Sequence, residues 1–312
     1  MLTTTKSLGT TILERIGNTP LVRLNLFEDR LSANIQILGK AEWANPGGSV
    51  KDRAASAIVT DARKRGLLSK ERGLLVATSG NTGIAYAMLG AALDFPVTLC
   101  MPSNVSPERK KYLSAYGAQV VWTNPADGSD GAIRKARELA ANEPDRYFYA
   151  DQYSNDENWR AHYRTTANEI WEQTEGQITH FVAGLGTSGT FMGTTRRLRE
   201  LNPNIRCISM QPDSPFNGLE GLKHMATAIV PKIYDATLAD ANIDMDTEVA
   251  YAMCRNLGRN HGILVGISAA AAVAASLQVA EQEAAAGREA VIVTILCDSA
   301  EKYMSERFWQ EE

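Results

Sequence analysis

Short apolar runs, many of them rich in β-branched residues, alternate with amphipathic or alanine-rich stretches along most of the chain. Several of the short runs are apolar throughout, which is typical of parallel strands that are buried on both faces. Strand, helix and strand in repetition predict an α/β fold with mostly parallel sheets and right-handed crossover connections. We expect strands at residues 35–41, 73–77, 97–101, 119–122, 180–183, 206–211 and 290–296.

The stretches between these runs carry apolar residues at helical spacing. The alanine-rich segment 268–275 lies in an apolar context, so it predicts a helix packed closely against its neighbours rather than a disordered tract. We expect further helices at residues 52–65, 83–93, 106–115, 131–142, 166–172, 189–201 and 247–260.

One break interrupts the alternation, at a segment rich in Asn, Asp and Pro over residues 141–156. We therefore expect two three-layer α/β/α domains, residues 1–155 and 156–312, and leave open whether the earliest strands pack on the second domain. The first would carry the candidate nucleophile described below, and the second a phosphate-binding loop.

Composition excludes several classes of protein. The chain has 312 residues and a net charge of −4 without a basic block, which makes it a poor nucleic-acid binder. Its apolar runs are shorter than the roughly 20 residues that span a bilayer, and its start has no secretory signal. The four cysteines form no C-x-x-C pair and the four histidines are scattered, so we expect no metal site and a cytoplasmic protein.

A first glycine-rich turn, Asn-Pro-Gly-Gly-Ser-Val-Lys-Asp-Arg, occupies residues 45–53. Its proline and glycines predict a tight turn into a helix that Ser49 and Asp52 would cap. Lys51 would then lie at the helix start, where the dipole disfavours a cation and so favours the neutral amine that a nucleophile needs. An exposed first-turn lysine is the alternative that local spacing leaves open.

Two further turns follow apolar strands and open helices, Thr78-Ser79-Gly80-Asn81-Thr82-Gly83 and residues 184–190. Backbone N–H groups at such a helix start can bind a carboxylate or a phosphate, although a simple capped turn would look the same. The second turn also matches the G-x-G-x-x-G dinucleotide pattern. No acidic residue ends the next strand, which finishes in Gln211, so a phosphate monoester fits better than NAD.

Five motifs in one order produce a more specific resemblance. The chain resembles the fold type II enzymes that use pyridoxal 5′-phosphate (PLP), within the cysteine synthase and cystathionine β-synthase group, and most of all the B-type cysteine synthases. The likeness covers nearly the whole chain. The motifs are I-G-N-T-P-L-V (16–22), N-P-G-G-S-V-K-D-R (45–53), T-S-G-N-T-G (78–83), G-T-S-G-T (186–190) and G-I-S (266–268).

The resemblance implies a role for each motif. Lys51 would form the Schiff base with PLP and shuttle the α-proton, Asn81 would bind the 3′-oxygen of the ring, and Ser268 would face the pyridine nitrogen. The substrate carboxylate would be held by Thr78, Ser79, Gly80, Thr82 and Gln152, and the cofactor phosphate by Gly186, Thr187, Ser188, Gly189 and Thr190.

The implied reaction is a β-replacement that converts O-acetylserine or O-phosphoserine, with sulfide or thiosulfate, into cysteine or S-sulfocysteine through an α-aminoacrylate. About 15 residues precede Ile16 and the chain ends soon after Tyr303, so we expect a stand-alone cysteine synthase, homodimeric as its relatives usually are. A cystathionine synthase, a catalytically silent partner of serine acetyltransferase and an NAD-binding protein remain alternatives.

Two positions qualify the resemblance. Several B-type enzymes place a basic residue at Lys223, where it could attract an anionic donor or acceptor, although a solvated surface lysine is the alternative. After Ser268 the family usually continues Ser-Gly, whereas this chain has Ala269 and Ala270, which leaves the fine geometry around the ring nitrogen open.

Overall fold

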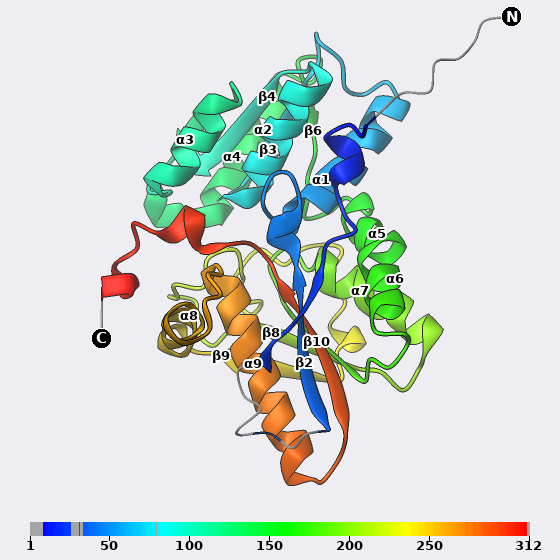
Figure 1. Ribbon diagram of the computed structural model, residues 1–312. Coiled ribbons are helices and arrows are strands. Elements are labelled where there is room, and N and C mark those ends of the chain that lie inside the picture. The colour runs from blue at the N-terminus through cyan, green and yellow to red at the C-terminus, as the bar shows by residue number, and fades with distance from the viewer. Residues whose placement is uncertain (1–8, 26–30, 32–33, 79, 311–312) are drawn as a thin grey trace, which may run out of the picture.

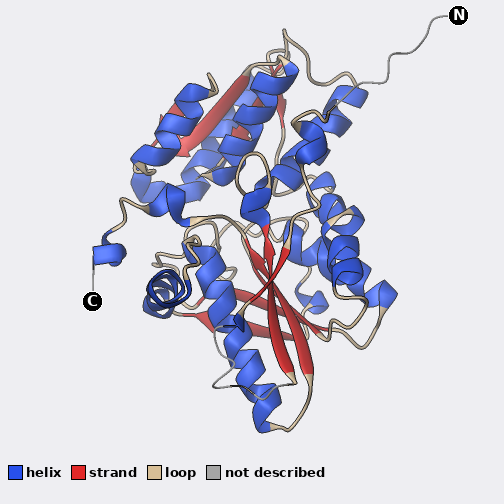
Figure 2. Ribbon diagram, in the orientation of Figure 1, coloured by secondary structure: helices blue, strands red, loops and turns tan. Residues whose placement is uncertain are grey.

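The structure is a computed structural model, and it describes residues 9–25, 31, 34–78 and 80–310. Two separate sheets organise the chain, a six-stranded sheet in the order β1-β2-β10-β7-β8-β9 and a four-stranded sheet in the order β5-β4-β3-β6 (Figure 2). Among the strands of the described residues only β1 pairs antiparallel, so the expected mostly parallel sheets are confirmed. The strands are β1 (Leu21–Arg23), β2 (Ile35–Ala41), β3 (Gly73–Ala77), β4 (Val97–Pro102), β5 (Gln119–Thr123), β6 (Tyr147–Tyr149), β7 (His180–Gly184), β8 (Arg206–Pro212), β9 (Ala241–Met245) and β10 (Ala290–Leu296).

Helices cover both faces of each sheet, which confirms the predicted three-layer α/β/α architecture (Figure 1). In the six-stranded sheet, α8 and α9 pack on one face and α6 and α7 on the other. In the four-stranded sheet, α1 to α3 cover one face and α4 the other. The helices are α1 (Lys51–Lys64), α2 (Asn81–Leu93), α3 (Pro107–Ala115), α4 (Gly128–Asn142), α5 (Glu157–Arg164), α6 (Thr166–Gln173), α7 (Gly189–Leu201), α8 (Thr247–His261) and α9 (Ile267–Ala285).

Burial on both faces of the sheet explains the continuous apolar runs. In β7, Phe181 and Ala183 face the α6–α7 core, whereas Val182 between them faces the α8–α9 core. Helix α9 is the alanine-rich helix expected from the sequence, and its alanines between residues 269 and 280 are almost fully buried between the sheet and α8. Small side chains allow this close approach.

The first two strands pack with the second half of the chain, although they lie before the domain boundary expected at residue 155. Strands β1 and β2 belong to the six-stranded sheet, where β2 pairs in parallel with β10 over its whole length, from Ile35 opposite Ala290 to Ala41 opposite Leu296. The segment after β10 then runs back to α3 beside the four-stranded sheet (Figure 1). The two ends of the chain thereby connect the two sheets. Within the described residues, no helix combines the length and the apolar character needed to cross a membrane.

Candidate active site

Most of the residues that the motifs single out line one pocket, which has an empty volume of ≈ 660 Å³. Its lining comes from the starts of α1, α2 and α9 and from the loop after β7, which is where parallel α/β sheets commonly bind ligands. An adjoining pocket of ≈ 400 Å³ shares Lys51, Gly186, Thr187 and Ser268 and adds Ser188 and Thr190. The predicted residues that line the first pocket are Lys51, Thr78, Gly80, Asn81, Thr82, Gln152, Gly186, Thr187, Lys223 and Ser268.

Two predicted residues stand apart from these linings. Gly189 lines neither pocket and instead begins α7, where a Cβ would lie 1.9 Å from Asn158 Oδ1. Ser79 lies outside the described residues.

Lys51 is the first residue of α1, at the end of a turn that is fixed from both sides. Val50 N–H donates to the carbonyl of Cys297 at 2.8 Å, and Gly48 adopts a left-handed φ of 74° that favours glycine. Ser49 Oγ accepts from Lys51 N–H at 3.3 Å. The expected cap by Asp52 is wrong, because its carboxylate turns back to accept from Gly47 N–H at 2.5 Å.

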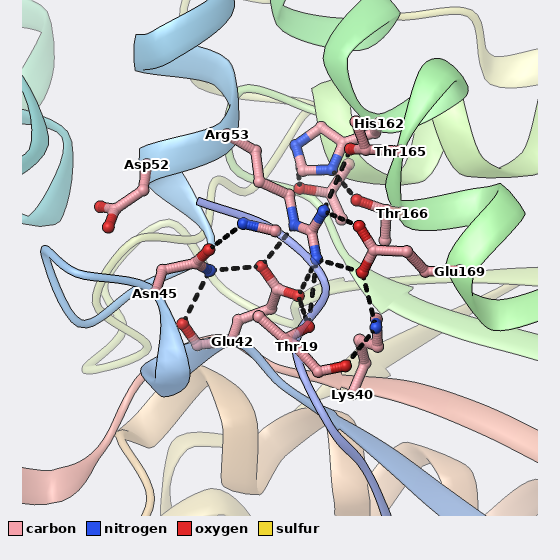
Figure 3. A network of polar contacts seen from close by, with 12 residues as sticks. Thr19, Lys40, Glu42, Asn45, Asp52, Arg53, His162, Thr165, Thr166 and Glu169 are labelled. Atoms are coloured by element: carbon pink, nitrogen blue, oxygen red, sulfur yellow. Dashed lines mark hydrogen bonds and ion pairs between the residues drawn. The ribbon is translucent and has the colours of Figure 1, made fainter. Parts of the chain in front are cut away.

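A buried network of charges surrounds Arg53, two residues after Lys51 (Figure 3). The Arg53 guanidinium donates to both carboxylate oxygens of Glu42, each at 2.8 Å, and to both of Glu169, at 2.6 and 2.7 Å. Lys40 Nζ lies 2.7 Å from Glu169 Oε2. Although burial raises it, hydrogen bonds and charge from Arg53 and Lys40 lower the pKa of Glu169 to about 2. The network fastens α1 to β2 and α6.

The loop after β3 is held by side-chain hydrogen bonds at its base. Thr78 Oγ1 accepts from Gly80 N–H at 3.1 Å. Thr82 Oγ1 donates to Gln152 Oε1 at 3.0 Å, and Gln152 Nε2 donates to the carbonyl of Ala77 at 2.9 Å. The structure therefore brings Gln152 to the loop that the resemblance assigns to the substrate carboxylate.

Asn81 is oriented by Asp298, which sequence reasoning did not assign to the site. Asn81 Nδ2 donates to Asp298 Oδ2 at 2.7 Å, and Asn81 Oδ1 is buried without a hydrogen-bond partner among the described residues. Tyr303 Oη donates to the same Asp298 oxygen at 2.7 Å, and burial raises the pKa of Tyr303 well above its usual value. The sequence position of Asp298 could have indicated a role in the site, because it lies two residues after β10, at the carboxyl end of the sheet where ligands commonly bind.

The loop after β7 leads into α7 through a strained residue. Ser188, the N-cap of α7, has a left-handed φ of 67°, which a non-glycine residue rarely adopts. Gly186 has no room for a side chain, because a Cβ would lie 2.2 Å from the carbonyl oxygen of Gly221. The N-terminal N–H groups of this 13-residue helix and the hydroxyls of Thr187 and Thr190 form a cradle suited to an anion.

Helix α5, which the sequence did not predict, supports this cradle with buried polar side chains. Asn158 Nδ2 donates to Thr187 Oγ1 at 3.0 Å, and His162 Nε2 lies 3.3 Å from Thr190 Oγ1. Burial, reinforced by the charge of Arg53, lowers the pKa of His162 to about 3, so the imidazole is neutral at physiological pH.

Lys223 is buried rather than solvated, so the surface alternative for it is wrong. Its side chain is 7% exposed and lines the pocket. Its Nζ lies 3.0 Å from Asp130 Oδ1 and 5.2 Å from the centre of the Tyr153 ring. Cys297 also lines the pocket, and burial raises the pKa of its thiol to about 11, which keeps it protonated.

Comparison with known proteins identifies the family. The family model described as "Pyridoxal-phosphate dependent enzyme" matches residues 12–298. The chain belongs to this family.

The relatives that match nearly the whole chain include several cysteine synthases. The chain is 51% identical over 304 residues to a cysteine synthase of Aquifex aeolicus, covering 97% of this chain and 93% of the relative. It is 39% identical to cysteine synthase B of Escherichia coli, covering 97% of both. Cysteine synthases of the A type have comparable identity. The crystal structure of O-acetyl serine sulfhydrylase isoform 3 from Entamoeba histolytica matches with a TM-score of 0.90 and 34% identity, over 98% of this chain and 93% of that one.

The residues of the two pockets fit the cofactor of the family. An amine at Lys51 reaches both pockets, the start of α7 offers N–H groups for a phosphate, and Asn81 Oδ1 is a buried polar atom that still needs a partner. A ring with a phosphate at one end and polar substituents at the other would satisfy these groups together. The helix start at Ser268 supplies a hydroxyl to the same space.

Proposed function

We propose that this protein is a cysteine synthase of the B type, which uses PLP to replace the β-substituent of O-acetylserine with a sulfur nucleophile. The observation that carries the proposal is the position of Lys51, which lines both the phosphate cradle and the pocket formed by the loop after β3. A reaction at the α- and β-carbons of an amino acid needs a basic amine at this junction.

In this assignment, each end of the cofactor has its own residues. Lys51 would hold its carbonyl carbon, Asn81 its 3′-oxygen, and Ser268 its pyridine nitrogen. The phosphate would lie at Gly186 to Thr190, at the positive end of α7. The bound cofactor supplies an electron sink that makes the α-proton of the amino acid acidic and its β-substituent a leaving group.

Side chains of this protein would transfer the proton and bind the substrate. Lys51 Nζ would take the α-proton of the bound amino acid and return that proton as the product forms. The loop of Thr78 to Thr82, together with Gln152, binds the substrate carboxylate at the start of α2, where the helix dipole favours an anion. Ser268 would not force protonation of the ring nitrogen as a carboxylate would, and this would favour elimination over transamination.

Lys223 is assigned to the anionic sulfur donor or leaving group, since it is a buried cation in the pocket wall. The test compares kcat/KM of Lys223→Ala with that of the wild type for O-acetylserine, O-phosphoserine, sulfide and thiosulfate. Losses that are larger for the more highly charged reactants support the assignment, and equal losses for all four contradict it.

The function itself is tested with purified protein loaded with PLP. Cysteine should form from O-acetylserine and sulfide, and Lys51→Ala should lose both this activity and the visible absorbance of the lysine-bound cofactor. Homocysteine in place of sulfide separates the two synthases, because faster formation of cystathionine than of cysteine would contradict the proposal. Visible absorbance that persists in Lys51→Ala would contradict the role of Lys51. A cytoplasmic homodimer belongs to the same proposal.

A further inference from the structure

One loop extends from the six-stranded sheet across the pocket, and two ion pairs connect it to helices that pack on the four-stranded sheet. The loop follows β8 and places Glu220 and Lys223 in the pocket lining. Glu220 pairs with Arg109 of α3, and Lys223 pairs with Asp130 of α4. Each cation of the pocket wall other than Lys51 thus already has a carboxylate partner.

Arg109 is a buried cation next to the loop that the proposed function assigns to the substrate. Its side chain is 3% exposed, its guanidinium lies 4.8 Å from the centre of the Tyr303 ring, and its Nε is buried without a hydrogen-bond partner among the described residues. A Cβ at Gly80 would lie 3.0 Å from that Nε. The charge of Arg109 is balanced by Glu220, whose side chain is 39% exposed.

Asp130 is fixed more firmly than Glu220. Its Oδ1 accepts from Lys223 Nζ at 3.0 Å, while its Oδ2 accepts from Ile229 N–H at 3.2 Å, further along the same loop. It lies in the first turn of α4, where the helix dipole stabilises a carboxylate. An anionic reactant that approaches Lys223 must compete with this anchored charge.

We propose that Asp130 and Glu220 determine the charge selectivity of the active site, an inference that rests on the proposed cysteine synthase function. The two carboxylates neutralise Lys223 and Arg109, so neither of these two cations offers uncompensated positive charge to a dianion. A reactant such as thiosulfate or the phosphate of O-phosphoserine has to displace a carboxylate, whereas hydrosulfide and O-acetylserine do not. Selectivity among the reactants then comes from fixed negative charges that oppose a dianion more than a monoanion.

The experiment measures kcat/KM of the PLP-loaded enzyme for thiosulfate and for sulfide, both at saturating O-acetylserine. Asp130→Asn and Glu220→Gln should each raise the ratio of thiosulfate to sulfide on the order of tenfold. The matched control is Glu138→Gln, which removes a carboxylate from an exposed ion pair with Lys135 on the same helix as Asp130 and should leave the ratio unchanged. Unchanged ratios in both test variants, or equal changes for both sulfur donors, overturn the inference.

A double variant tests whether Asp130 acts through Lys223. If it does, the rise in the ratio caused by Asp130→Asn should disappear when Lys223→Met is also present. Calorimetric binding of thiosulfate to the PLP-loaded enzyme, without amino acid substrate, should show the same pattern in affinity. A rise that survives in the double variant contradicts the route through Lys223.

The outcomes separate this inference from the function on which it rests. A wild type that forms no cysteine from O-acetylserine and sulfide contradicts the proposed function. A wild type that forms cysteine, with variants that keep its thiosulfate-to-sulfide ratio, contradicts only the charge selectivity. Should Asp130→Asn fail to fold, Glu220→Gln decides the question, since its half-exposed side chain contributes little to packing.

Discussion

Removing the charge of Glu169 tests whether the buried network around Arg53 stabilises the fold. Glu169→Gln keeps the shape of the side chain but leaves Arg53 and Lys40 without the carboxylate that both contact. A fall in the pKa of Glu169 from 4.5 to about 2 corresponds to about 3 kcal/mol of stability at neutral pH. Partial solvent screening of a carboxylate that is not fully buried reduces this to about 2 kcal/mol.

The sign of the pH dependence follows from the direction of the pKa shift. A carboxylate whose pKa is lowered by folding contributes its full stabilisation above its unfolded pKa, near 4.5, and loses it as the pH falls toward about 2. The difference in unfolding free energy between wild type and Glu169→Gln should therefore be about 2 kcal/mol at pH 7, and at pH 3 less than half of that value.

Denaturant unfolding of the PLP-loaded protein at pH 7 and pH 3 measures this difference. The control is Glu172→Gln on the same helix, because Glu172 is exposed and takes no part in the network, and it should change stability by less than about 0.5 kcal/mol. A difference for Glu169→Gln that is the same at both pH values, or no larger than that of the control, would refute the electrostatic reasoning.

Two further predictions concern the loops of the site. Gly186→Ala should weaken PLP binding at least tenfold, because the added Cβ would lie 2.2 Å from the carbonyl oxygen of Gly221. Gly258→Ala is the control, since its added Cβ would meet no atom closer than 3.1 Å. Titration of each variant with PLP, followed by absorbance, compares their affinities, and equal affinities would exclude the clash. Burial raises the pKa of Asp52 to about 7, so ionisation destabilises the folded protein and stability should fall as the pH rises from about 4 to 7. In Asp52→Asn that fall should be smaller, as thermal melting across this range would show, and an unchanged pH profile would contradict the assigned pKa.

The sequence predicted the central strands well because burial on both faces leaves an uninterrupted apolar run. Residues 35–41, 73–77 and 290–296 match β2, β3 and β10 at both ends. The strands that were not predicted, β1, β6 and β9, all lie at the edges of their sheets and are three to five residues long. β1 and β6 are only three residues long and β9 is largely polar, so none of them forms a clear apolar run, whereas the edge strand β5 does.

Helix α5 was missed for a reason connected to the site. Its buried side chains include Asn158 and His162, so the helix presents polar groups where a core helix would present apolar ones. Those groups are buried because they contact the hydroxyls of Thr187 and Thr190. A search for apolar residues overlooks this helix, because it is only eight residues long and two of its buried side chains are polar.

The same reasoning explains which site residues the motifs revealed. Glycines and hydroxyl residues cluster within a few positions at each loop that faces the pocket, so local spacing predicts them. Asp298, by contrast, reaches Asn81 across 217 positions of sequence, and Arg53 joins Glu169 across 116. Each of these contacts joins an element of the four-stranded sheet and its helices to an element of the six-stranded sheet and its helices. Such contacts depend on how the two sheets pack against each other, which no local pattern encodes.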